Sequence, residues 1–190
     1  MASPDLPILL FETKQTFVDW LARYHDRSEG MWLKLAKKDA DIPSVTYDEA
    51  VETALCYGWI DGQKKGFDEK FWLQKFTPRR SKSIWSKINR EKAEKLIASG
   101  QMRPAGLAAI ERAMQNGRWE AAYDSQRTIT IPDDFMSELD KNPKAKSFFE
   151  TLTSAKRYSF LFRIQTAKKP ETRQKRICQY VEMLERSESF

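Results

Sequence analysis

The chain has 190 residues, of which 41% are hydrophobic and 32% charged, and its formal net charge at pH 7 is +6. This length suits one domain with or without a helical extension, and the apolar content is enough for a packed core, which excludes full disorder. No apolar run approaches the roughly 18–20 residues of a membrane-spanning helix, so an integral helical membrane protein is excluded. The first residues lack the basic segment and long apolar run of a secretory signal, and we expect a cytoplasmic protein.

The first third of the sequence predicts alternating helices and strands. Apolar residues recur at helical spacing over 14–24, and they alternate with polar ones over 31–37, which predicts a helix followed by a strand. Thr46 with Glu49 three residues later forms a capping box and predicts the start of a second helix. Gly58 is a residue that commonly ends a helix, and we expect this second helix to end there.

Two further strands are expected at 59–60 and 70–76, joined by a turn-rich segment at 61–68. After Pro78 the pattern becomes helical, apart from an extended link at 128–132. The predicted helices are 90–99 between Asn89 and Gly100, 104–116 between Pro104 and Gly117, 133–139, 143–152 behind Asn142, 155–166 behind Ser154, and 170–184.

These elements predict an α+β fold. Residues 1–82 are expected to form an α+β unit with a small antiparallel sheet and helices. Residues 83–190 are expected to form a mostly α-helical portion that packs on this unit, so that the two parts make one integrated domain.

The positive charge is concentrated in two segments. Residues 63–95 hold 11 Lys and Arg against 4 Asp and Glu, and residues 141–176 hold 11 against 2. A basic face attracts phosphates, nucleic acid or anionic lipid. The alternative is an ordinary lysine-rich surface in contact with water.

Most residue patterns of known catalytic and metal sites are missing from the sequence. His25 is the single histidine, and there is no glycine-rich dinucleotide loop, no P-loop and no metal-ligand spacing, so we expect no cofactor and no metal. Cys56 and Cys178 each lie among apolar residues, and both are expected to be small buried side chains. A reactive thiol is the alternative for Cys56, because basic residues follow it.

The segment 58–64 is the first candidate site, because two glycines bracket Trp59 and Asp61. In a functional interpretation, Asp61 orients a ligand or acts as a base in a pocket lined by tryptophan. In a structural interpretation, Asp61 accepts hydrogen bonds from backbone amides of a turn, and Trp59 belongs to the core.

The segment 76–86 is the second candidate, because it places Arg79, Arg80, Ser83 and Trp85 just before a predicted helix. Arginines, hydroxyls and helix N-termini favour anions, so these residues predict a phosphate or carboxylate site. The same residues also suit an ordinary loop with helix caps, in which Trp85 is partly structural.

Two classes of function remain open. The first is a non-catalytic module that binds an anionic small molecule, nucleic acid or an acidic protein, with Trp72, Phe76 and Trp85 available to stack on bases. The second is a small enzyme for an anionic substrate, with Asp61 as base or orienter and Arg79, Arg80 and Ser83 as an anion clamp. Arg173 and Arg176 in the last predicted helix are a further candidate cationic group, or simply a solvated helix face.

A series of ordered motifs runs through the chain: TYDEAV (46–51), ALCYGWIDG (54–62), FTPR (76–79), SIWS (83–86), GQMRPAG (100–106), GRW (117–119) and AKKPETRQKRI (167–177). Over about residues 10–185 these motifs resemble the YdeI/OmpD-associated, bacteriocin-protection (OmdA-like) family. The resemblance implies a bacterial protein linked to survival of bacteriocins or antimicrobial peptides, and to an outer-membrane porin. It implies no established reaction and no assigned functional residue.

Overall fold

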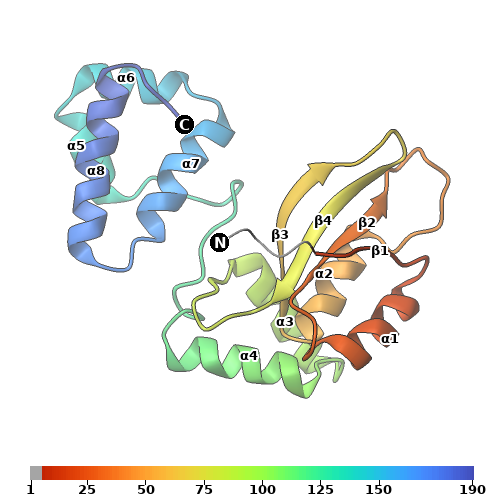
Figure 1. Cartoon of the computed structure of the whole chain (residues 1–190). Helices are drawn as coiled ribbons and strands as arrows, with labels where there is room; N and C mark the ends of the chain where they lie inside the picture. Colours follow the sequence, from red (N-terminus) through yellow and green to blue (C-terminus); the bar gives the residue numbers. More distant parts are fainter. Residues whose placement is uncertain (1–5) are drawn as a thin grey trace. The chain divides into compact units, whose positions relative to one another are not determined.

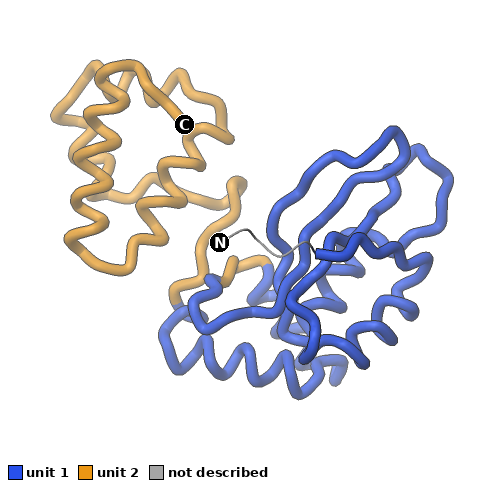
Figure 2. Tube along the Cα trace, in the orientation of Figure 1, with its two compact units in different colours: residues 1–84, 89–120 blue, residues 85–88, 121–190 orange. Residues whose placement is uncertain are grey.

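The computed structural model describes residues 6–190, which form eight helices and one four-stranded sheet (Figure 1). The chain gathers into two compact units (Figure 2). Unit 1 comprises the residues up to 84 together with 89–120, and unit 2 comprises 85–88 together with 121–190. The predicted α+β class is confirmed, with the sheet in the N-terminal part and helices alone toward the C-terminus. The expected division at residues 82 and 83 stays a prediction.

The sheet of unit 1 has the strand order β1-β2-β4-β3. Its strands are β1 (Ile8–Leu10), β2 (Met31–Ala36), β3 (Trp59–Gly66) and β4 (Phe71–Pro78). The pairs β2–β4 and β3–β4 are antiparallel, whereas β1 lies parallel to β2 and makes the sheet mixed. With three residues, β1 is too short to show a period in the sequence.

Strand β3 corrects the predicted turn at 61–68. It continues to Gly66, and its pairing with β4 shifts register between Asp61 and Lys64. Such a bulge places an extra residue in one strand and breaks the strict alternation of faces. The polar, glycine-containing sequence of β3 therefore looked like a turn although it is paired along most of its length.

Four helices accompany the sheet in chain order: α1 (Lys14–Tyr24), α2 (Tyr47–Cys56), α3 (Lys87–Ala98) and α4 (Pro104–Gln115). The predicted capping box is confirmed, since the Thr46 side chain accepts from the Glu49 backbone N–H and Glu49 accepts from that of Thr46. The Thr46 backbone N–H and the Thr46 hydroxyl both donate to the Glu49 carboxylate, and these two bonds lower the pKa of Glu49. The predicted cap at Asn89 is wrong, because α3 begins at Lys87.

Helices α1 and α2 cover the inner face of the sheet. Phe17 of α1 contacts Phe76 edge to face with ring centroids 6.1 Å apart, and Tyr47 of α2 lies 5.9 Å from Trp72. After α2, Gly58 adopts φ +71°, and a Cβ there would stand 2.7 Å from the carbonyl oxygen of Ala105. Only glycine allows the chain to turn from α2 into β3 so close to α4.

Unit 2 contains α5 (Asp133–Asp140), α6 (Pro143–Thr151), α7 (Ser154–Gln165) and α8 (Pro170–Glu185). Its core consists of apolar side chains from all four helices, among them Phe135, Phe149, Phe160 and Ile177. Asn142 caps α6 as predicted. The predicted cap Ser154 is wrong by one position, because the Thr153 side chain accepts the bond from the Lys156 backbone N–H. Over residues 6–190, no helix combines the length and apolar character needed to cross a membrane.

Candidate functional site

The structure places Trp59 in the core of unit 1. Its side chain is 1% exposed, and its indole N–H donates a 3.0 Å hydrogen bond to the backbone carbonyl of His25. Its ring meets Trp20 edge to face at 5.8 Å. The structural interpretation of Trp59 is confirmed, because a ring so enclosed packs the inner face of the sheet against α1.

Asp61 is half-buried on the same face, where one of its carboxylate oxygens accepts a 2.7 Å hydrogen bond from the Tyr47 hydroxyl. Tyr47 also contacts the ring of Trp72, and the Lys64 ammonium lies 4.3 Å from the centroid of that ring. Asp61 therefore belongs to a polar and aromatic row that joins β3, β4 and the start of α2.

The segment 79–85 forms a closed loop. The Arg79 side chain is buried and donates a 3.1 Å hydrogen bond to the carbonyl of Ile84. The Ser83 hydroxyl accepts from the Arg80 backbone N–H, and the Ser83 N–H donates to the Arg80 carbonyl. Arg80 is exposed and Trp85 is buried. Two cations of this segment, Arg80 and Lys82, thus face solvent, while Arg79 contributes to the structure of the loop.

Burial also corrects the predicted stacking set. Phe76 and Trp85 are 0% and 2% exposed, so neither ring can receive a base without unfolding its surroundings. Trp72 is half-buried between Tyr47 and Lys64.

The arginines of the last helix hold unit 2 together. Arg173 donates 2.6 and 2.8 Å hydrogen bonds to the two oxygens of Asp134 and a third, of 3.1 Å, to the carbonyl of Ile164. The Arg173 guanidinium holds the pKa of Asp134 below its ordinary value. Arg176 donates to the carbonyl of Arg163. Both side chains therefore join α8 to neighbouring helices of unit 2.

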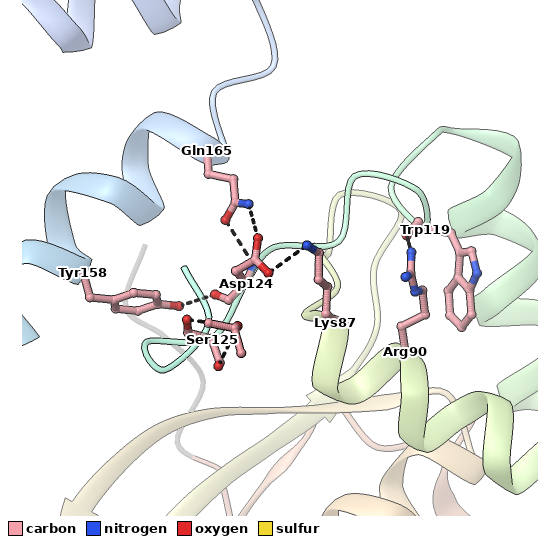
Figure 3. A network of polar contacts seen from close by, with 8 residues as sticks. Lys87, Arg90, Trp119, Asp124, Ser125, Tyr158 and Gln165 are labelled. Carbon is pink, nitrogen blue, oxygen red and sulfur yellow. Dashed lines mark hydrogen bonds and ion pairs between the residues drawn. The ribbon is translucent and has the colours of Figure 1, made fainter. Parts of the chain in front are cut away.

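Asp124 is the centre of a second polar network in unit 2 (Figure 3). One of its carboxylate oxygens lies 2.7 Å from the Lys87 ammonium, and the other accepts a 2.6 Å hydrogen bond from Gln165. The Tyr158 hydroxyl donates to the Asp124 carbonyl. Burial opposes ionisation of Asp124, but the bonds from Lys87 and Gln165 outweigh it and lower its pKa. This satisfied network ties the 123–128 loop to α7 and to the start of α3.

The outer face of the sheet carries the cations that sequence reasoning did not single out. Residues opposite each other on antiparallel strands share a face, and Trp32 pairs with Lys75 across β2 and β4. The Lys65 ammonium lies 4.0 Å from the centroid of the Trp32 ring, and the Lys75 ammonium lies 5.9 Å from it. Trp32 is half-buried, so part of its ring is accessible.

A second aromatic and cationic group lies farther along β2 on this face. The Lys34 ammonium is 4.0 Å from the ring of Phe71 and 4.7 Å from that of Phe67, which is 47% exposed in the β3–β4 turn. Asp68 approaches Lys34 at 4.0 Å. We call the following set the outer sheet face: Ile8, Leu10, Trp32, Lys34, Lys65, Phe67, Phe71 and Lys75.

Two family models match the chain. One, described as a domain of unknown function (DUF8412), matches residues 9–109, which is more than half of the sequence. The chain belongs to the DUF8412 family. The other, described as "Bacteriocin-protection, YdeI or OmpD-Associated", matches residues 128–187. The comparisons with curated proteins and with solved structures found no match.

The two matches follow the compact units. The DUF8412 match falls in unit 1 except for residues 85–88, and the second match lies wholly in unit 2. The resemblance to the YdeI/OmpD-associated family is thereby supported, over 128–187 rather than over most of the chain. The outer sheet face lies in the DUF8412 part, apart from Ile8.

The environment of Cys56 does not activate its thiol. Burial raises the pKa of Cys56, although the nearby cations Lys14 and Arg103 oppose the shift. The expectation that Cys178 is buried is wrong, because this residue is exposed on α8. Within residues 6–190, no group of three His, Cys, Asp or Glu side chains could hold a metal ion.

Proposed function

We propose that unit 1 binds single-stranded nucleic acid across the outer sheet face. The observation that carries the proposal is the half-buried ring of Trp32 with two lysine ammonium groups, of Lys65 and Lys75, within 6 Å of its centroid. Proteins that bind single strands combine an aromatic ring on which a base stacks with cations that follow the phosphates.

The lysines are suited to change partners when a strand binds. A cation over an exposed ring is held by about 0.5–1 kcal/mol, and a lysine head group moves on a flexible stem. A base can therefore replace the Lys65 ammonium on Trp32, and the ammonium can move to the adjoining phosphate. The ammonium therefore has a favourable contact both before and after the strand binds.

The face offers a second aromatic and cationic group along the same strand, in which Phe67 is the exposed ring and Phe71 is buried. Trp32 pairs with Lys75, and Phe71 pairs with Ala36 four residues farther along β2, which is roughly 13 Å of strand. A strand of several nucleotides could contact both groups. The aromatic rings favour nucleic acid over an acidic protein, because an acidic peptide would use the lysines but not the ring faces.

The family description supplies the biological setting of the proposal. The bacteriocin-protection match concerns residues 128–187, and we propose that nucleic-acid binding by unit 1 serves a stress or antimicrobial-peptide response in the cytoplasm. The sheet face gives no support to a porin partner.

The direct test is fluorescence polarisation with a labelled oligothymidylate and with an oligouridylate at rising salt. If Lys34, Lys65 and Lys75 all contact phosphates, the slope of the logarithm of the binding constant against the logarithm of the salt concentration is expected to be about −2. Trp32→Ala should weaken binding about five- to 150-fold, since stacking contributes about 1–3 kcal/mol per base.

The matched control removes the same number of positive charges from a surface outside the outer sheet face. Lys65→Gln with Lys75→Gln should weaken binding and flatten the salt slope, whereas Lys168→Gln with Lys169→Gln removes two exposed lysines of unit 2 and should change neither. Equal losses in the two double variants, or an unchanged affinity of Trp32→Ala, would contradict the proposal.

A further inference from the structure

A small cavity in unit 1 lies apart from the outer sheet face. It is lined by residues of α1, of the C-terminal half of α2 and of the segment before α4, and its volume is about 110 Å³. Val18, Tyr57 and Arg103 also line a more open hollow of about 500 Å³ beside it. The two hollows adjoin each other through these three shared residues, and we call the smaller one the chamber.

Thr53 in the wall of the chamber has an unusual hydroxyl group. Its side chain is 2% exposed, and its Oγ1 has no hydrogen-bond partner among the described residues. Buried hydroxyl groups are nearly always satisfied by protein or by bound molecules, because leaving one unpaired is costly. The Oγ1 atom itself has almost no accessible surface, so the Thr53 side chain must rotate before a polar group inside the chamber can bond it and remove this cost.

Two cations line the same chamber, and one of them, Lys14, also acts electrostatically on Glu49. Within residues 6–190, neither the Lys14 ammonium nor the Arg103 guanidinium makes an ion pair or a side-chain hydrogen bond. Both act electrostatically on Cys56. The acidic residue of the wall, Glu52, lies 3.5 Å from the Lys92 ammonium, which also lies 3.3 Å from Asp48, so Lys92 offsets part of the Glu52 charge. The chamber is therefore positive on balance.

The rest of the wall is apolar. Val18, Leu96 and Cys56 line it, and the raised pKa of the Cys56 thiol keeps that side chain neutral. The volume is well below the roughly 300–1,000 Å³ of sites for drug-sized ligands, which excludes a nucleotide from the chamber. An occupant must be small, with an anionic head and a short apolar body.

We propose that this chamber binds a small aliphatic carboxylate. The carboxylate lies between Lys14 and Arg103, the Thr53 hydroxyl donates to it, and the short alkyl chain packs on Val18 and Leu96. This site is separate from the outer sheet face, and carboxylate binding is a function additional to the nucleic-acid binding proposed for that face.

The test is a titration of the full chain with acetate, butyrate and hexanoate, and in a separate series with inorganic phosphate. Binding is monitored through the ¹⁵N chemical shifts of the backbone amides at constant ionic strength. Butyrate should bind more tightly than acetate and should shift the amides of Thr53, Cys56 and Arg103. Arg103→Gln should weaken butyrate binding about tenfold, and Thr53→Val, which keeps the shape but removes the hydroxyl, about threefold or more.

Arg112→Gln is the matched control, because Arg112 is an exposed arginine of α4 outside the chamber. It should leave butyrate affinity unchanged. The proposal is overturned if no carboxylate binds at millimolar concentration, if phosphate alone binds, or if Arg112→Gln and Arg103→Gln lose equal affinity. Oligonucleotide affinity should be the same in all of these variants, so that failure at one site is distinguishable from failure at the other.

Discussion

The last helix of unit 2 and the outer sheet face of unit 1 use their basic residues in opposite ways. In unit 2, Arg173 and Arg176 donate to a carboxylate and to backbone carbonyls of neighbouring helices. On the outer sheet face of unit 1, the ammonium groups of Lys34, Lys65 and Lys75 lie over aromatic rings. Arginine suits the first task because its planar fork bonds several acceptors at once, whereas lysine is a mobile point charge.

The difference shows that local charge density does not measure the charge available to a partner. The segment 141–176 has the larger excess of basic residues, yet part of that charge contributes to folding. The lysines of the sheet are fewer, but their weak contacts with rings can be exchanged for phosphates. Stability should therefore respond to the arginines and ligand binding to the lysines.

The largest expected effect is on stability, and it distinguishes a tryptophan on the inner face of the sheet from one on the outer face. Trp59→Ala should lower the free energy of unfolding by about 3–5 kcal/mol, because it empties a core site and breaks the bond to the His25 carbonyl. Trp32→Ala should cost much less stability. Urea denaturation of both variants measures the contrast, and equal losses would show that Trp32 is also a core residue.

Arg173→Ala should destabilise unit 2 by about 1.5–3 kcal/mol, since it removes three hydrogen bonds that involve a charged group. Arg173→Lys keeps the charge but not the paired geometry, and should recover only part of the loss. Hydrogen exchange should accelerate in α5–α8 while the amides of the sheet keep their rates. Full recovery by lysine would mean that charge alone matters there.

Acid should weaken unit 2 through Asp134. Its pKa is lower in the folded chain than in the unfolded chain, so the stabilisation is complete above the ordinary value of 3.8 and is lost as pH falls through the folded value. Asp134→Asn should therefore be less stable at pH 7 and show a flatter decline below about pH 4. Urea midpoints across this range provide the measurement, and parallel declines in the two proteins would exclude this role for Asp134.

The smallest expected effect is on the stability of the lysine variants. Lys65→Gln and Lys75→Gln should each change the free energy of unfolding by less than about 0.5 kcal/mol, because exposed substitutions without buried partners seldom do more. Thermal denaturation checks this. A large loss would mean that the contacts with Trp32 stabilise the fold and that the lysines are less free than proposed.

Local signals in the sequence predicted much of the fold. The helix over Lys14–Tyr24 and the capping box at Thr46 followed from spacing and from cap chemistry, which depend on neighbours within one turn. Strand β1 and the continuation of β3 depend on pairing with distant strands, so nothing local marked them.

The candidate surface was missed for the same reason. Alternation in β2 places Trp32 and Lys34 on one face, but only the sheet register brings Lys65 and Lys75 to Trp32. The dense basic turn at 79–83 attracted attention instead, although Arg79 is buried in its own loop. The chamber at Thr53 likewise joins residues of α1, α2, α3 and the segment before α4, which no sequence spacing relates.

The most direct measurement of the central claim is an NMR titration of the six tryptophan indole N–H signals with an oligothymidylate. Trp32 should shift or broaden in proportion to the bound strand, while Trp59, whose N–H donates to the His25 carbonyl, should stay in place. This pattern would locate the strand on the outer sheet face. An unmoved Trp32 signal under saturating oligonucleotide would contradict the account.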